Sequence, residues 1–134
     1  MAVLQQTTVD AFKRSEAQLS ARWLADLEAS GAARNLKAED LHQQTSEFLQ
    51  LLTAVLEKGG SLSITTADWD ETRQFLEKLS HQRAMAGQDS QQTAHFIFAL
   101  KGPVFSLLQH AYADQPGVLA EQLWEVSQLL DTLG

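Results

Sequence analysis

The sequence predicts an all-α protein, organised as a bundle of four to six helices, and three observations support this fold class. Apolar residues recur at helical spacing through most of the chain. The two prolines and seven glycines cluster between these periodic stretches, as expected of the breaks between helices. The composition, 44% apolar and 20% charged, is typical of a soluble globular domain. The elements are justified in chain order below.

The first helix is predicted to begin at about Leu4 or Thr8 and to end at Ala29, before Gly31. Its apolar residues fall on one face at helical spacing. They are Val9, Phe12, Leu19, Trp23 and Leu27. A packed amphipathic helix is the interpretation of this segment.

The second helix is predicted from about Glu39 to Lys58, where Gly59 and Gly60 stop it. Its apolar stripe consists of Leu41, Phe48, Leu49, Leu52, Val55 and Leu56. The third helix is predicted to begin near Asp68 and to end at the turn formed by Ala86 and Gly87. It is expected to present Trp69, Phe75, Leu76 and Leu79 to the core.

The fourth helix is predicted from about Ser90 to Tyr112. It is apolar almost all round between Phe96 and Leu108, so we expect it to be the central element and to pack against several neighbours. Pro103 lies within it. Because proline lacks an N–H and clashes with the carbonyl four residues earlier, a kink is expected near Ala99 to Pro103.

The last helix is predicted to start after Pro116 and Gly117 and to run to about Leu133. Its apolar residues follow a heptad spacing, which is compatible both with burial inside one globule and with pairing against a second copy. Trp124 and Leu129 add a second apolar face, and the seam continues to the end of the sequence. We therefore expect a homodimer interface and a helix that continues into another module. The predicted interface residues are Leu119, Leu123, Trp124, Val126, Leu130 and Leu133.

Length and composition limit the class of protein. With 134 residues the chain is expected to form one domain, residues 1–134. It lacks cysteine and carries a net charge of −7 with scattered basic residues, which argues against thiolate sites and nucleic-acid binding. The longest apolar runs are too short to span a bilayer, and no leader pattern is present. A cytoplasmic location without membrane contact is expected.

No arrangement of residues predicts catalysis or metal binding. None of the four histidines, His42, His81, His95 and His110, has a partner at the spacing of a helical zinc site. The letters around His95 and Lys101 resemble a phosphotransfer helix, but a six-residue separation places the lysine on a different face from the histidine. We therefore expect no catalytic residues, no metal site and no enzyme activity.

One set of short motifs resembles a known family. The chain contains Leu79-Ser80 and Arg83-Ala84-x-x-Gly87, then Ser90-Gln91-Gln92-Thr93 and, at the end of an apolar run, Leu100-Lys101. This arrangement resembles the N-terminal sensor domain of RsbR-type stressosome proteins. The resemblance extends from Trp23 to the segment Leu129-Leu130-Asp131. The family's usual Ser-Pro-Glu-Thr is replaced here by Ser90-Gln91-Gln92-Thr93, which keeps the helix cap but loses the proline and the carboxylate.

The resemblance implies a globin-like helical fold without obligatory haem. It also implies a non-enzymatic sensor that dimerises through its last two helices and passes a stress signal through a C-terminal helix. The signal would reach a downstream STAS domain, through which stressosome partners assemble. On this basis no cofactor is expected, and the stimulus is not specified by the sequence.

Two other functions remain open at the level of sequence. A haem-bound oxygen sensor of the same fold would need a proximal histidine, for which His81 is the nearest candidate and His95 the next. A stand-alone all-α interaction module would bind a partner helix in an apolar groove and would use the same amphipathic faces.

Overall fold

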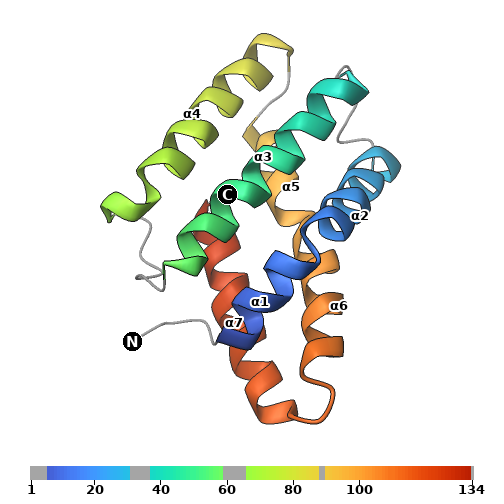
Figure 1. Ribbon diagram of the computed structural model, residues 1–134. Coiled ribbons are helices and arrows are strands. Elements are labelled where there is room, and N and C mark those ends of the chain that lie inside the picture. Colours follow the sequence, from blue (N-terminus) through green and yellow to red (C-terminus); the bar gives the residue numbers. More distant parts are fainter. Residues whose placement is uncertain (1–5, 31–36, 59–65, 88–89, 134) are drawn as a thin grey trace.

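The computed structural model describes residues 6–30, 37–58, 66–87 and 90–133, and these ranges contain helices and no strand. The all-α prediction is therefore confirmed (Figure 1). The helices are α1 (Gln6–Arg14), α2 (Glu16–Ala29), α3 (Ala38–Glu57), η1 (Ala67–Trp69), α4 (Asp70–Met85), α5 (Ser90–Phe98), α6 (Lys101–Ala111) and α7 (Pro116–Leu133). No described helix combines the length and the apolar character that crossing a membrane requires.

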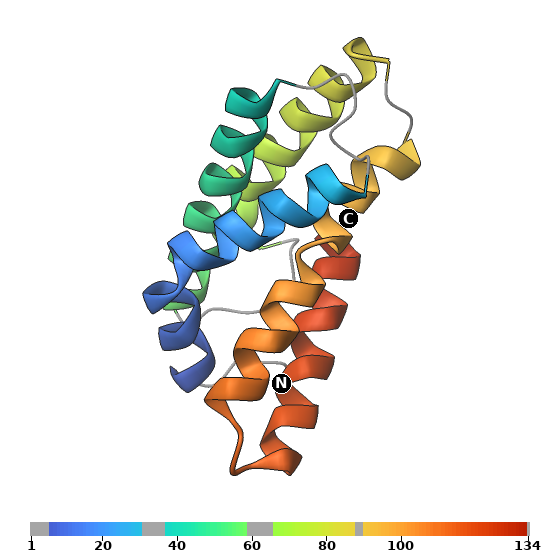
Figure 2. The ribbon, with the colours of Figure 1, turned by 90° about the vertical axis from the view of Figure 1, so that its right-hand side faces the viewer.

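The predicted first helix is divided into α1 and α2, so the prediction of one continuous helix was wrong. The break is at Ser15, whose backbone angles, φ −110° and ψ 16°, lie outside the helical range. The chain bends there without losing its hydrogen bonds, since Ser15 N–H donates to the carbonyl of Ala11 at 3.1 Å. The bend lets α1 pack against α3 and α6 while α2 also packs against both of them (Figure 2).

The predicted second helix is confirmed as α3, which lies beside α4 (Figure 1). Its whole predicted stripe is buried: Leu41, Phe48, Leu49, Leu52, Val55 and Leu56. On the following segment Trp69 belongs to η1 rather than to the α-helix, and it is fully buried together with Leu79 of α4. Phe75 and Leu76 are half-buried against the core.

The turn after α4 has the geometry that its glycine predicts. Gly87 has φ +87°, the left-handed conformation that glycine adopts without steric strain. Its N–H donates to the carbonyl of Ala84 at 3.1 Å, which closes the helix end. Either Asp89 or Ser90 was expected to cap the next helix; Asp89 lies outside the described residues, as does the side chain of Ser90, whose backbone begins α5.

The kink predicted for the fourth helix is present as a break between α5 and α6. The helix is interrupted at Ala99 and Leu100, and Pro103 occupies the first turn of α6. A proline in a first turn removes no hydrogen bond that the helix needs. The predicted central position is also confirmed, because α5 contacts α4 and α7 while α6 contacts α1, α2 and α7.

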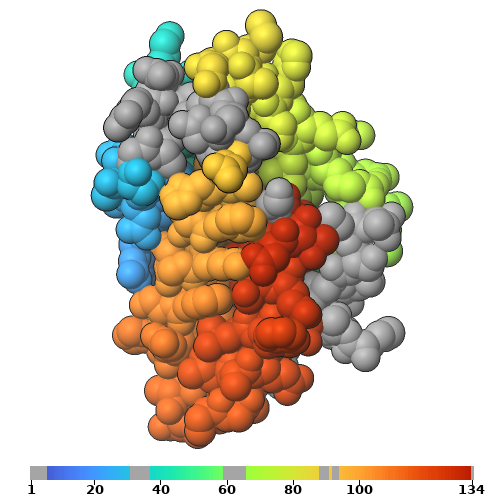
Figure 3. Space-filling view, turned by 180° about the vertical axis from the view of Figure 1, so that it is seen from behind, coloured from blue at the N-terminus to red at the C-terminus, as the bar shows by residue number. Residues whose placement is uncertain are grey.

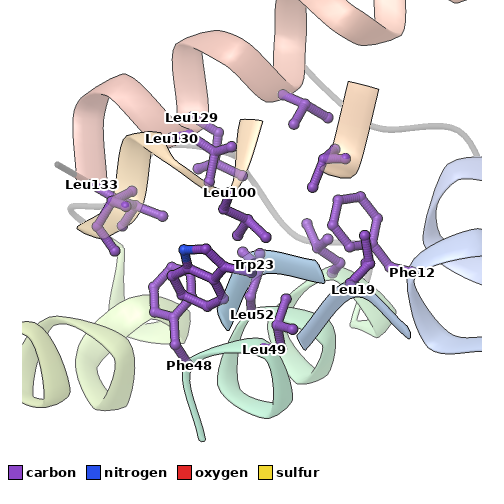
Figure 4. Packing of buried hydrophobic residues seen from close by; sticks show 14 of the residues in the cluster. Phe12, Leu19, Trp23, Phe48, Leu49, Leu52, Leu100, Leu129, Leu130 and Leu133 are labelled. Atoms are coloured by element: carbon purple, nitrogen blue, oxygen red, sulfur yellow. The ribbon is translucent and has the colours of Figure 1, made fainter. Parts of the chain in front are cut away.

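The last helix, α7, packs against α5 and α6 and ends at Leu133 as predicted, but it begins at Pro116, so Pro116 and Gly117 form its first turn and do not precede it. Its residues Leu129, Leu130 and Leu133 point toward Leu100 and Trp23 in the core (Figure 4). Seen from behind, α6 and α7 lie side by side and form much of the surface (Figure 3). The helix that was expected to transmit a signal is thus joined to the centre of the bundle.

Candidate functional site

The predicted interface residues fall on two sides of α7. Three of them belong to the core of the protomer, namely Val126, Leu130 and Leu133. Leu119 and Leu123 are partly buried and pack against that core. Trp124 is different, because 62% of its surface is exposed. The heptad seam therefore serves mainly the interior of the protomer.

Trp124 is the part of the prediction that stays available to a partner. Tryptophan is among the residue types that contribute most binding energy at protein interfaces, so an exposed one is a candidate contact. It lies on a helix that contributes Val126, Leu130 and Leu133 to the core. Because α7 is one continuous helix, a partner that contacts Trp124 also acts on the core of the protomer.

A buried chain of hydrogen bonds holds the N-terminal half of α7 in place. Tyr112 donates its hydroxyl proton to Thr8 Oγ1 over 2.6 Å, and Thr8 Oγ1 donates to Gln122 Oε1 over 2.7 Å. The direction follows from Gln122 Oε1, which can only accept. All three side chains are buried. We call them the Thr8 cluster; it ties α1 to α7 and to the residue that follows α6.

A second buried polar group carries a charge. Arg83 of α4 is 1% exposed although it carries a guanidinium group. Its Nη2 donates to Gln44 Oε1 of α3 over 2.9 Å. The guanidinium carbon lies 4.4 Å from the centre of the Phe96 ring, a favourable cation–π arrangement. Burial lowers the pKa of Arg83 to about 10, so the group is still charged at neutral pH.

Arg83 lines a groove of about 690 Å³ between α3 and α4, which we call the α3–α4 groove. Its apolar lining residues are Leu51, Phe75, Leu79 and Ala86. Its charged lining residues are Lys37, Asp40, Glu47, Glu71, Lys78 and Arg83, so positive and negative charges balance. Lys37, Asp40, Glu47, Glu71 and Lys78 form no ion pair with another residue in the described ranges.

The groove is connected to the core by aromatic side chains. Phe96, beneath Arg83, lies 4.6 Å from Trp23 between ring centres, and Trp23 lies 5.6 Å from Phe48. Phe48 in turn lies 6.1 Å from Phe75 on the groove wall. Trp23 Nε1 also donates to the carbonyl of Phe96 over 2.8 Å. Of these four rings only Phe75 lines the groove, so the groove meets the aromatic cluster at one end.

The histidines do not assemble into a site. All four are on the surface, and the described residues contain no group of histidine, aspartate and glutamate that could hold a metal ion. His81 and His95, the haem candidates, do not line the α3–α4 groove. Haem requires an axial imidazole directed into an apolar pocket, and the exposed position of both rings does not provide it. His95 is separated from Lys101 by the break between α5 and α6.

Comparison with known families identifies the chain. The sequence profile described as "RsbT co-antagonist protein rsbRD N-terminal domain" matches residues 17–134. The chain belongs to this family. The match includes α2 to α7, so the stressosome RsbR-type N-terminal domain suggested by the motifs around Arg83 and Gly87 is confirmed. Comparison with curated proteins and with solved structures gave no significant match.

Sequence reasoning missed the burial of Arg83 and of the Thr8 cluster. A signal for Arg83 existed, because Phe75, Leu79 and Arg83 are spaced four residues apart and therefore share one face of α4. A signal for Gln122 existed as well, since it precedes the buried Val126 by one turn. Polar residues on an apolar stripe identify candidates for burial. Their partners Thr8 and Phe96 come from distant helices and have no such signal.

Proposed function

We propose that this chain is the N-terminal signalling domain of a stressosome RsbR-type regulator, that it is not an enzyme, and that it works as a dimer. In this proposal a stress signal changes the position or packing of α7, and the change passes to a STAS domain that follows in the protein. Family membership supports the regulator. The observation that carries the dimer is the exposure of Trp124 on a helix whose other side is built into the core.

The coupling through α7 is supported by its contacts. Its second half packs against Leu100 and Trp23, whereas its first half is held by Thr8 through Gln122. A rearrangement of either set of contacts changes the position of α7 as a whole, because α7 is one continuous helix. To transmit a signal, α7 needs two arrangements of similar free energy. Contacts at either end of the helix must be able to shift the balance between these arrangements.

Self-association tests the dimer. Sedimentation equilibrium of residues 1–134 should give twice the monomer mass at micromolar concentration. Trp124→Glu should shift the protein to monomer, because a charge replaces an apolar contact, while leaving helicity unchanged since the side chain is exposed. Val126→Glu is less informative, because Val126 is buried and a charge there destabilises the fold.

Met85→Glu is the matched control. Met85 is also a large exposed apolar residue, 78% exposed at the end of α4, so this variant should remain dimeric. A wild-type protein that sediments as a monomer at high micromolar concentration would contradict the dimer. The proposed STAS coupling is tested separately, by reading the coding sequence downstream of Gly134: a STAS sequence is expected there, and a different module would contradict it.

A further inference from the structure

The N-terminal helix α1 is short and lies outside the segment that matches the family profile. It has nine residues, and isolated helices of fewer than about 12–15 residues are only marginally stable in water. The profile match begins at residue 17, so it includes α2 to α7 and not α1. The stability of α1 therefore depends on the contacts that it makes with the rest of the domain.

The contacts of α1 are of two kinds. Its apolar side chains Val9, Ala11 and Phe12 are buried, and the helix packs against α2, α3 and α6. Its polar side chain Thr8 is buried as well and donates a hydrogen bond to Gln122 Oε1 over 2.7 Å. This hydrogen bond joins α1 directly to α7.

The link between α1 and α7 is made by neutral polar groups. When such a hydrogen bond is broken and both partners reach water, new bonds to water replace it, so the net loss of stability is small. An apolar contact has no such replacement, because water does not compensate for it. The link at Gln122 can therefore break more easily than the apolar packing that holds the C-terminal half of α7, at Leu129, Leu130 and Leu133.

The junction at Ser15 allows α1 to open separately from α2. The carbonyl of Ser15 accepts a hydrogen bond from the N–H of Leu19 in α2 at 2.8 Å, and its N–H donates to the carbonyl of Ala11 in α1 at 3.1 Å. The backbone angles of Ser15 already depart from those of a helix. The chain before Ser15 can thus lose its helical hydrogen bonds while α2 keeps its own.

We propose that α1 is a releasable helix that controls the N-terminal half of α7. In the closed state, which is the state of the structure, Thr8 is bonded to Gln122. In the open state α1 has left its contacts as one unit, Gln122 has lost Thr8, and the N-terminal half of α7 moves more freely. The C-terminal half of α7 stays packed in the core in both states.

Opening of one contiguous element, at a free energy below that of global unfolding, is known from folded proteins in general. The inference deepens the proposed function and rests on it for the role of α7 as the helix that transmits the signal. The opening of α1 itself is a property of the domain alone, so it can be measured without a partner or a STAS domain.

Amide hydrogen exchange of the intact chain, followed by NMR at low and increasing urea concentration, tests the open state. The reporters in α1 are the amides of residues 10–15, because the first four N–H groups of a helix have no acceptor within it. Their opening should expose little surface, so its free energy should depend less on urea than that of the core amide of Leu52 in α3. The amides of residues 122–125 should exchange through the same opening as α1, whereas that of Leu130 should behave as Leu52.

A variant in each helix tests the link. Thr8→Val should speed exchange about 30-fold in residues 10–15 and 122–125, whereas Thr7→Val, at an exposed position, should not. Gln122→Met should also speed exchange in α1, because coupling between two sites acts in both directions. The exposed Gln128 lies on the same helix, so Gln128→Met is the matched control and should leave α1 unchanged.

Leu79→Ala separates local opening from global unfolding. Leu79 is buried on α4, and its loss destabilises the closed and the open state alike. The variant should therefore speed the exchange of Leu52 and leave that of α1 unchanged.

Two results would overturn the proposal. If α1 and Leu52 show the same urea dependence, or if Leu79→Ala speeds both equally, α1 is an inseparable part of the core. If α1 opens while residues 122–125 stay as protected as Leu130, α1 frays without controlling α7. Neither result would change the dimer, which sedimentation tests through Trp124.

Discussion

The Thr8 cluster and Arg83, two of the buried polar groups in the described part of the chain, differ in charge and in access to solvent. The Thr8 cluster is neutral, and its hydrogen bonds run in one direction, from Tyr112 through Thr8 to Gln122 Oε1, inside the bundle. Arg83 is charged, and although it is equally buried it lines an open groove. A neutral, closed cluster is suited to fixing the alignment of helices. A desolvated charge contributes little net stability, because the cost of its desolvation offsets the contacts that it gains.

The largest effect is expected at the residue on which Arg83 rests. Phe96→Ala should lower the free energy of unfolding by about 3–5 kcal/mol, the range for deleting a buried phenylalanine side chain, because Phe96 packs on Trp23 and under the guanidinium. Urea denaturation followed by circular dichroism measures the effect. Phe98→Ala, two residues away and 38% exposed, should cost clearly less. Similar costs for the two variants would show that the aromatic cluster is not a structural support.

Removing the central hydroxyl of the Thr8 cluster should give the next largest effect. Thr8→Val keeps the shape of the side chain but removes the acceptor for Tyr112 and the donor for Gln122. Buried polar atoms that lose their partner destabilise a protein, so a loss of about 2 kcal/mol is expected. The neighbouring Thr7→Val is the control, because Thr7 is exposed and should change stability by only a few tenths of a kcal/mol.

Arg83→Met should have a smaller effect on stability than Thr8→Val, and this difference is the most direct test of the comparison. Methionine keeps the apolar stem on Phe96 and removes a charge whose burial is unfavourable, while Gln44 is only half-buried. The free energy of unfolding should change by about 1 kcal/mol or less. If Arg83→Met costs as much as Thr8→Val in the same urea titration, Arg83 has a structural role and the comparison fails.

The smallest effect is expected for a charge pair on the surface, which serves as a reference for the buried charge of Arg83. Lys101 pairs with Asp131 and joins α6 to α7, but half of the Asp131 side chain is exposed. Asp131→Asn should lower stability by about 0.5 kcal/mol at low salt and by nothing measurable in high salt. Glu121→Gln on the same helix, which removes an exposed charge without this pairing, should show no such salt dependence. A large, salt-independent loss would mean that this contact is part of the core.

Local elements could be predicted because local chemistry specifies them. The stripe of α3, the left-handed turn at Gly87 and the break before Pro103 each depend on residues within a few positions of one another. The bend at Ser15 could not be predicted in this way. Ser15 is compatible with a continuous helix, and the bend is favoured by contacts that α1 and α2 make with distant helices.

The candidate functional residues on α7 and at Arg83 could likewise be predicted only in part from the sequence. The sequence marked α7 as the important helix, but its apolar periodicity was compatible with an internal core and with a partner. The structure places Val126, Leu130 and Leu133 inside and leaves Trp124 outside. Arg83 was noticed as part of a motif, whereas its burial and its position beside Gln44 and Phe96 required the packing of three helices to be known.

The sequence by itself determined that this chain is helical, where most of the helices begin and end, and to which family it belongs. Those properties depend on hydrophobic periodicity, on the positions of glycine and proline and on short motifs. Each of these signals lies within a contiguous segment of the sequence. Only the tertiary structure decided which face of α7 is free, which polar side chains are buried and where a groove opens. These depend on contacts between residues far apart in the chain, and one apolar pattern is compatible with several partners.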